Sequence, residues 1–206
     1  MAHQGLIMDF GGVMTTPMHL NSRAFEQEHG LAVGSYTRAL SEHPDGVRVY
    51  ADVEIGRATQ AEWNAVIGTI LGVDPTDLMR RALANLRPEP DMVAYVAAAR
   101  AAGVVTALLS NSFGGPYDVY ADLGLLGLFD VVVLSDQAGV RKPDPAIYDM
   151  TLQRMGVAGP QAVFVDDVAD NLLPAEALGI TTIHYTSSEA AIESLNRLFT
   201  QVRSRP

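Results

Sequence analysis

Gly5-Leu-Ile-Met-Asp-Phe-Gly-Gly-Val-Met14 is the stretch of sequence that decides the fold of this chain. Leu6 to Met8 form a short apolar run, which predicts a buried strand. Asp9 ends that run, and Gly11 and Gly12 then break the strand. A carboxylate at the end of a buried strand is costly to desolvate. In open α/β sheets this place faces the crevice where ligands bind. Asp9 could also simply cap a turn, so the other strand ends have to decide between the two interpretations.

From residue 88 onwards, helical patterns alternate with short apolar runs. The apolar runs predict strands at 104–109, 130–134, 161–165 and 180–184. The helical patterns lie between them at 88–102, 117–123, 144–155, 169–178 and 187–199. Strands that are apolar on both faces and alternate with helices are typical of a parallel sheet. The sequence therefore predicts an α/β fold with five parallel strands and helices on both faces.

Between the first strand and residue 88 the sequence shows helical patterns and no convincing strand. We expect helices at 21–29 and at 36–42, the second closed by Pro44-Asp-Gly46. The capping box Thr59-Gln-Ala-Glu62 predicts another helix, and Asp74-Pro75 predicts one with Asp as its N-cap. These helices form a compact inserted unit. The predicted division is a Rossmann-like core of residues 1–15 and 88–206, with a helical cap of residues 16–87.

Composition limits the classes of function. The formal net charge of -10 argues against nucleic acid as a partner, because a basic surplus is needed to neutralise phosphates. No apolar run approaches the ~18 residues of a membrane span. Cysteine is absent, which excludes disulfides and thiolate sites and fits a cytoplasmic protein. Residues 1–5 have no charged region or cleavage signature, so we expect no signal peptide. Nothing in the sequence indicates an oligomeric state.

Polar residues follow several of the predicted strands. The carboxyl ends of parallel strands lie at one edge of a sheet, so we expect these residues to share one crevice. They are Asp9 after the first strand, Ser110-Asn111 after the second, Arg141-Lys142 downstream of the third, and Asp166-Asp167 after the fourth.

Their chemistry is consistent. Asp9 and Asp167 are hard oxygen ligands that could share a Mg²⁺ ion, and Asp166 could hold a water of that ion. Ser110 and nearby backbone amides could receive phosphate oxygens, which Lys142 could neutralise as a point charge. Asp9 is then placed to attack the phosphoryl group covalently. The sequence therefore predicts a site for a phosphoryl group beside a metal ion.

Four motifs resemble those of the haloacid dehalogenase-like (HAD) hydrolase superfamily. In chain order they are Leu6-Ile-Met-Asp-Phe-Gly-Gly-Val-Met14, Leu108-Leu-Ser-Asn-Ser112, Arg141-Lys-Pro-Asp-Pro145 and Val163-Phe-Val-Asp-Asp-Val-Ala-Asp-Asn171. The inserted unit is similar to the small helical cap of that superfamily, and Glu54-Ile-Gly-Arg-Ala-Thr59 looks like a cap turn. The nearest branch resembles sugar-phosphate phosphatases and the N-terminal phosphatase domain of epoxide hydrolases. The resemblance implies a Rossmann-like, parallel five-stranded sheet that carries an inserted cap.

The resemblance also implies roles for the site residues. Asp9 would be the nucleophile that forms an aspartyl-phosphate, and Lys142 would stabilise this intermediate. The phosphate would be bound by Ser110 and Asn111. The Mg²⁺ ligands would be Asp9, Asp167 and the backbone carbonyl of Gly11, with Asp166 in the second shell. The implied partner is a small phosphorylated metabolite, with no nucleic acid and no membrane.

Gly11 departs from the pattern of the superfamily. Most of its phosphatases have an aspartate here, which protonates the leaving oxygen and later deprotonates water. Glycine can do neither, and such help is typically worth ~10²–10⁴-fold in rate. The favoured reading is a Mg²⁺-dependent phosphatase that prefers leaving groups of low pKa. The alternatives are a metal-independent haloacid dehalogenase, and a binding or regulatory protein that has lost turnover.

Overall fold

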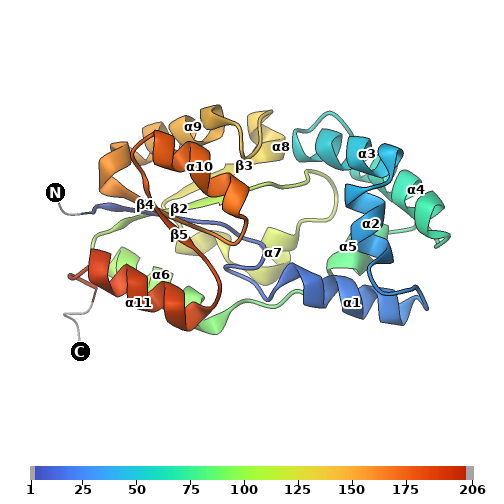
Figure 1. Cartoon of the computed structure of the whole chain (residues 1–206), viewed down its shortest axis with the longest axis horizontal. Helices are drawn as coiled ribbons and strands as arrows, with labels where there is room; N and C mark the ends of the chain where they lie inside the picture. The colour runs from blue at the N-terminus through green and yellow to red at the C-terminus, as the bar shows by residue number, and fades with distance from the viewer. Residues whose placement is uncertain (1–2, 203–206) are drawn as a thin grey trace.

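Five parallel strands form the central sheet, in the order β3-β2-β1-β4-β5 (Figure 1). The computed structural model describes residues 3–202, so residues 1–2 and 203–206 of the predicted core lie outside the described part. The strands are β1 (Gly5–Met8), β2 (Val105–Ser110), β3 (Val131–Leu134), β4 (Ala162–Asp166) and β5 (Thr181–His184). The predicted fold class, an α/β Rossmann-like parallel sheet, is confirmed.

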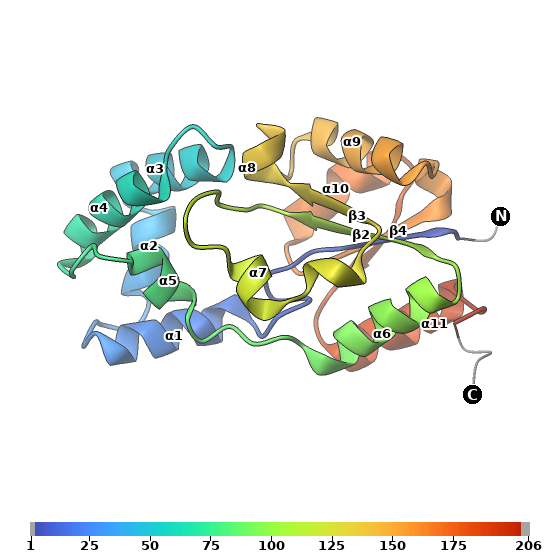
Figure 2. The same cartoon turned by 180° about the vertical axis from the view of Figure 1, so that it is seen from behind.

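Helices cover both faces of the sheet. On one face lie α6 (Pro90–Ala101) and α11 (Ser188–Leu198), and on the other lie α9 (Pro145–Met155) and α10 (Ala169–Ala177) (Figures 1 and 2). Alternate residues of β1 serve the two faces. Leu6 and Met8 pack into the larger apolar core, whereas Ile7 packs into the smaller one with α9 and α10. This two-sided burial explains why the strand reads as a continuous apolar run.

Short elements connect the strands and helices of the core. They are α7 (Val119–Leu123), the 3-10 turn η1 (Leu126–Leu128), α8 (Ser135–Ala138) and the 3-10 turn η2 (Gly159–Gln161). The sequence patterns did not predict α8, which follows β3 directly. In residues 3–202, no helix combines the length and the apolar character that crossing a bilayer requires.

A group of helices lies beyond the carboxyl ends of the strands (Figure 1). It consists of α1 (Met18–Glu28), α2 (Ser35–Ser41), α3 (Pro44–Glu54), α4 (Gln60–Leu71) and α5 (Leu78–Leu83), and we call it the helical insert. The two segments that join it to the sheet run side by side. Thr15 bridges Pro88 in antiparallel fashion, and Thr16 N donates to Arg87 O at 2.8 Å. The chain therefore enters and leaves the insert at one point.

Two details of the insert differ from the prediction. Pro44-Asp-Gly46 does not close a helix but begins α3, because proline is tolerated in the first helical turn and His43 caps Asp45 N. Gly46 is required for close packing rather than for a turn. A Cβ at this position would lie 1.8 Å from the backbone oxygen of Ala39 in α2.

Asp74-Pro75 also has a different role from the one predicted. The Asp74 Oδ1 atom accepts a hydrogen bond from Thr76 N at 2.9 Å, so it closes a local turn instead of capping a helix. Asp77 then takes up left-handed backbone geometry, with φ of 49°, and α5 begins one residue later at Leu78. The Asp74 side-chain oxygen that closes this turn is the same group that would otherwise cap a helix, so the turn forms in place of a helix start at Asp74.

Candidate active site

The register of the sheet brings the predicted strand ends together. Met8 pairs with Leu108 on one side and with Val165 on the other. Asp9 N continues the ladder by donating to Val165 O at 2.9 Å. Asp9 and Asp166 therefore follow paired residues of neighbouring strands and lie level with each other at the edge of the sheet.

Lys142 joins these two carboxylates. Its Nζ atom donates to Asp9 Oδ1 at 2.6 Å and to Asp166 Oδ2 at 2.7 Å. The three residues are 2%, 7% and 0% exposed respectively, so the pairing is almost fully desolvated. Burial alone would lower the pKa of Lys142, but the charges of the two carboxylates raise it above its ordinary value. The lysine is therefore held as a cation, as buried ion pairs require.

The carboxylates outnumber the cation at this point. Burial raises the pKa of Asp9 to about 7; Lys142 opposes that rise, and the charges of Asp166 and Asp167 add to it. Burial, followed by the charge of Asp166, also raises the pKa of Asp167. Asp9, Asp166 and Asp167 each offer an oxygen atom, and these atoms lie within 4.8 Å of one another. An oxygen-only, net negative donor set of this size fits a hard divalent cation such as Mg²⁺.

Gly12 leaves the space that Asp167 occupies. Gly12 has φ of +83°, and a Cβ there would lie 2.6 Å from Asp167 Oδ2. A side chain at this position would displace the carboxylate. Gly12 is therefore needed both for its backbone conformation and for the approach of Asp167 to the loop that follows Asp9.

Both oxygens of Asp166 have partners within the protein. Oδ1 accepts from Val168 N at 2.8 Å and from Asn171 Nδ2 at 3.0 Å, while Oδ2 accepts from Lys142 and, at 3.1 Å, from Asn171. This carboxylate thus orients Lys142 and the start of α10. Asn171 belongs to the fourth motif, but nothing in the sequence pattern indicated that it would hold Asp166.

Asn111 and Ser110 are also at the site, with side chains already engaged. Asn111 Oδ1 accepts from Lys142 N at 2.8 Å, and its Nδ2 donates to Lys142 O at 3.1 Å. The Asn111 amide therefore holds the backbone of the lysine, and a phosphate contact by Asn111 has to come from its own backbone. Ser110 Oγ lies 2.9 Å from the hydroxyl of Tyr120. Tyr120 is a neighbour that the sequence did not reveal.

These residues line a cavity of about 260 Å³ between the sheet edge and the helical insert. The insert contributes Met18, Tyr50, Glu54 and Leu83 to its wall. Gly11 lies beside Met18, and a Cβ at Gly11 would come 3.2 Å from the Met18 sulfur. The thioether thus occupies space next to the place where a longer side chain at Gly11 would begin.

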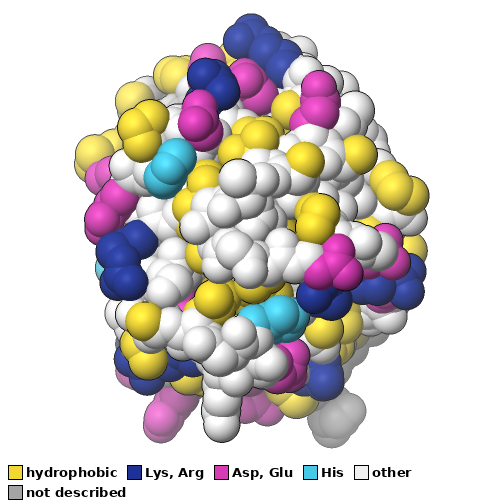
Figure 3. Space-filling view, turned by 90° about the vertical axis from the view of Figure 1, so that its right-hand side faces the viewer, with side chains coloured by type: hydrophobic (Ala, Val, Ile, Leu, Met, Phe, Trp, Pro, Cys, Tyr) yellow, Lys and Arg dark blue, Asp and Glu magenta, His cyan; other side chains and the backbone are white. Residues whose placement is uncertain are grey.

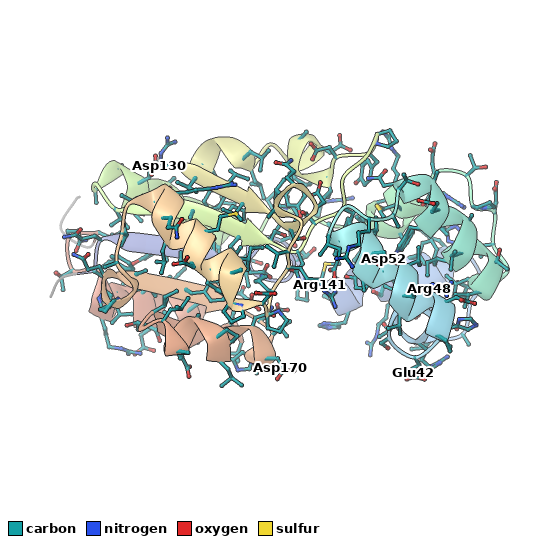
Figure 4. The ribbon with its side chains drawn as sticks, turned by 90° about the horizontal axis from the view of Figure 1, so that it is seen from above. Glu42, Arg48, Asp52, Asp130, Arg141 and Asp170 are labelled. Atoms are coloured by element: carbon teal, nitrogen blue, oxygen red, sulfur yellow. The ribbon has the colours of Figure 1, made fainter. Side chains whose placement is uncertain are left out.

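Glu54 and Arg141 tie the insert to the core. Figure 4 shows Arg141 at the junction between the two. Its guanidinium pairs with the Glu54 carboxylate, which is 3% exposed, and burial raises the pKa of Glu54 although Arg141 opposes this. The Glu54 carbonyl also accepts from Ser135 Oγ at 2.5 Å. The sequence did not indicate this contact, because its partners are more than 80 residues apart.

Comparisons with known proteins are consistent with this geometry. A family model for haloacid dehalogenase-like hydrolases matches residues 3–179. Acyl-CoA dehydrogenase family member 10 of Mus musculus is 38% identical over 53% of this chain and 10% of that protein. The sesquiterpene phosphatase astK of Aspergillus oryzae is 24% identical over 93% of this chain and 94% of its own length. The chain therefore spans a small part of the first relative and nearly all of the second.

Solved structures show the same fold. A HAD family enzyme from Bacteroides thetaiotaomicron, solved in complex with magnesium and inorganic phosphate, superposes with a TM-score of 0.65. It is 22% identical, and the match covers 90% of this chain and 95% of that one. At this identity the likeness establishes the architecture of the chain.

Proposed function

The chain belongs to the haloacid dehalogenase-like hydrolases, and from that premise we propose that it is a Mg²⁺-dependent phosphatase of small phosphorylated metabolites. The observation that carries the proposal is the buried Asp9–Lys142–Asp166 cluster with Asp167 beside it. A halide-releasing enzyme needs no metal. Asp166 could still orient Lys142 in such an enzyme, but the second carboxylate, Asp167, would have no ion to bind. A phosphatase uses both, because a metal and a lysine together offset the charge of a phosphoryl group.

The proposed metal ligands are Asp9, Asp167 and the backbone carbonyl of Gly11, with Asp166 acting through water. When bound, Mg²⁺ would offset negative charge on the phosphoryl group. Lys142 would also offset this charge, while Asn111 and Asp166 fix its position. The phosphate-binding residues in this proposal are Ser110 and Asn111, the second through its backbone.

The chemistry runs in two displacements at phosphorus. One Asp9 oxygen attacks the phosphorus atom, the bond to the leaving oxygen breaks, and that oxygen leaves with the electron pair. Water then attacks the phosphorus of the aspartyl-phosphate, which releases phosphate and restores the Asp9 carboxylate. Gly11 supplies neither the acid of the first step nor the base of the second. We therefore propose that substrates with leaving groups of low pKa, such as phenols, are favoured.

We also propose that residues 16–87 act as a cap over a core of residues 1–15 and 88–206. The cavity beside Asp9 is walled on one side by Met18, Tyr50, Glu54 and Leu83, all of which come from the insert. Caps and lids of this kind exclude water and determine which substrates reach the reacting group.

The proposal is tested with a panel of aryl phosphates, Mg²⁺ and the variant Asp9→Asn. We expect phosphate release by the wild type that stops with EDTA and is absent from the variant. Equal release by both proteins would show that Asp9 does not turn over phosphate esters. Halide release from a 2-haloacid that EDTA leaves unchanged would support the dehalogenase alternative instead.

A further inference from the structure

The helical insert contains a second cavity, which we call the insert cavity. Its volume is about 440 Å³, which lies in the range of small-molecule binding sites. The side chains around it come from all the insert helices and from the core segments after β2 and before α9, and most of them are apolar. They include Tyr36, Leu40, Val47, Trp63 and Met79.

The insert cavity adjoins the cavity beside Asp9. Four residues line both: Met18, Tyr50, Leu83 and Phe113. Phe113 comes from the segment after β2, and its ring lies 6.2 Å from that of Tyr50 on α3. A ligand with its phosphoryl group at Asp9 would therefore meet this shared wall first and continue into the insert cavity.

Several polar groups around the insert cavity are already paired. Arg141, the one cation in the described lining, forms its ion pair with Glu54. The hydroxyls of Ser22 and Ser41 donate to backbone oxygens one turn earlier in their own helices, at 3.0 and 2.9 Å. A second phosphate would find no unpaired cation among these residues. The indole Nε1 of Trp63 has no hydrogen-bond partner in the described part of the chain and offers a ligand one donor, whereas a sugar carries a hydroxyl on nearly every carbon.

A basic patch on the face of the molecule at the end of the insert could also attract an anion. Figure 3 shows acidic and basic side chains scattered over this end of the molecule, without a patch of one sign. Selection of the substrate therefore depends on the cavities rather than on a long-range field.

We propose that the insert cavity binds a hydrocarbon body of the substrate, so that the substrate class is monophosphates of apolar phenols, whose leaving groups have low pKa, rather than of sugars. The inference rests on the proposed phosphatase function, because the phosphoryl group has to lie at Asp9. Apolar surface removed from water drives binding in proportion to the area that is buried. Binding strength should therefore increase with the length of the hydrocarbon chain until the insert cavity is filled.

A series of alkylphosphonates from methyl to decyl tests this in the presence of Mg²⁺, because phosphonates are not hydrolysed and report binding alone. Trp63 is the only tryptophan of the chain and lines the insert cavity, so its fluorescence should change as the longer members bind. We expect binding to tighten by about two- to fourfold per methylene group over the first members. Equal affinity across the series would overturn the inference.

A pair of matched variants tests whether the insert cavity causes the dependence of phosphonate binding on chain length. Val47 is 43% exposed and lines the insert cavity, so Val47→Trp should fill it and flatten the chain-length dependence in calorimetry. Val33 is 73% exposed and does not line it, so Val33→Trp should retain the wild-type dependence. If Val47→Trp does not fold, Thr37→Trp on α2 makes the same test. Unchanged chain-length dependence in the filled variant would also overturn the inference.

Phosphate release from phenyl phosphate separates this inference from the proposed function. Mg²⁺-dependent release together with flat phosphonate binding would leave the phosphatase in place and overturn the apolar substrate class. Length-dependent binding without any release would support the insert cavity and contradict the phosphatase.

Discussion

Replacing Gly11 with aspartate should convert the enzyme to one that accepts poor leaving groups. Gly11 has no left-handed φ, so aspartate fits the backbone. Its Cβ would lie 3.2 Å from Met18 Sδ and 3.4 Å from Met18 Cγ, and a flexible thioether can give by the few tenths of an ångström needed. A general acid at this position contributes ~10²–10⁴-fold, equivalent to about 3–5 kcal/mol of barrier. We expect this gain for alkyl phosphates and much less for nitrophenyl phosphate.

The assay is kcat/KM for a series of phosphate esters that differ in leaving-group pKa. Wild-type rates should fall steeply as that pKa rises, and Gly11→Asp should flatten the slope. Gly11→Asn is the matched control, because it has nearly the same volume and cannot transfer the proton. The reasoning is refuted if Gly11→Asn accelerates alkyl phosphates as much as Gly11→Asp does, or if a folded Gly11→Asp retains the wild-type slope. If Gly11→Asp keeps the wild-type slope, the double variant Gly11→Asp, Met18→Ala shows whether contact with Met18 had displaced the new carboxylate.

Three further outcomes follow from the contacts of the site. Asn111→Ala should destabilise the protein by about 1–3 kcal/mol and lower kcat, because the Lys142 backbone loses both amide contacts. An unchanged urea-unfolding midpoint together with an unchanged kcat would contradict this prediction. Glu54→Gln should lower the free energy of unfolding in urea by about 1–3 kcal/mol, at the low end of this range because Arg141 is 38% exposed. An unaltered unfolding midpoint would show that the Glu54–Arg141 ion pair does not stabilise the contact between the insert and the core. Metal-free protein should lose stability as pH rises from about 4 to about 7, because burial raises the pKa of Asp9 from 3.8 to about 7 and the folded state holds a proton that the unfolded chain has already released. Thermal unfolding of Asp9→Asn should lack that loss, and a parallel pH profile in the variant would exclude Asp9 as its source.

The sheet was predictable from the sequence because its strands are local patterns. Each apolar run is buried on both faces, so it stands out from the amphipathic helices around it. The polar residues that end these runs also follow from local sequence, since the carboxyl ends of parallel strands share an edge. The structure brings Asp9, Ser110, Lys142 and the Asp166-Asp167 pair together there. Their individual roles remain proposals.

The features that sequence reasoning missed depend on contacts between distant segments. Gly46 reads locally as a turn residue, but it is needed because α3 crosses Ala39 of α2 too closely for a side chain. Asn111 reads as a phosphate ligand, but its amide is bonded to the Lys142 backbone 31 residues away. Glu54 lines the cavity only because Arg141 and the helical insert pack against each other. None of these relationships has a period or a motif that one segment reveals by itself.

Detection of a phosphorylated Asp9 during turnover tests the central claim most directly. Because Gly11 supplies no base for the second displacement, breakdown of the aspartyl-phosphate should be slow when the leaving group departs easily. With nitrophenyl phosphate and Mg²⁺, we expect a burst of nitrophenol equal to the enzyme present. Mass spectrometry of the acid-quenched protein should then find one phosphoryl group on the peptide that contains Asp9. Steady release of nitrophenol without a burst, from protein whose Asp9 stays unmodified throughout, would contradict the account.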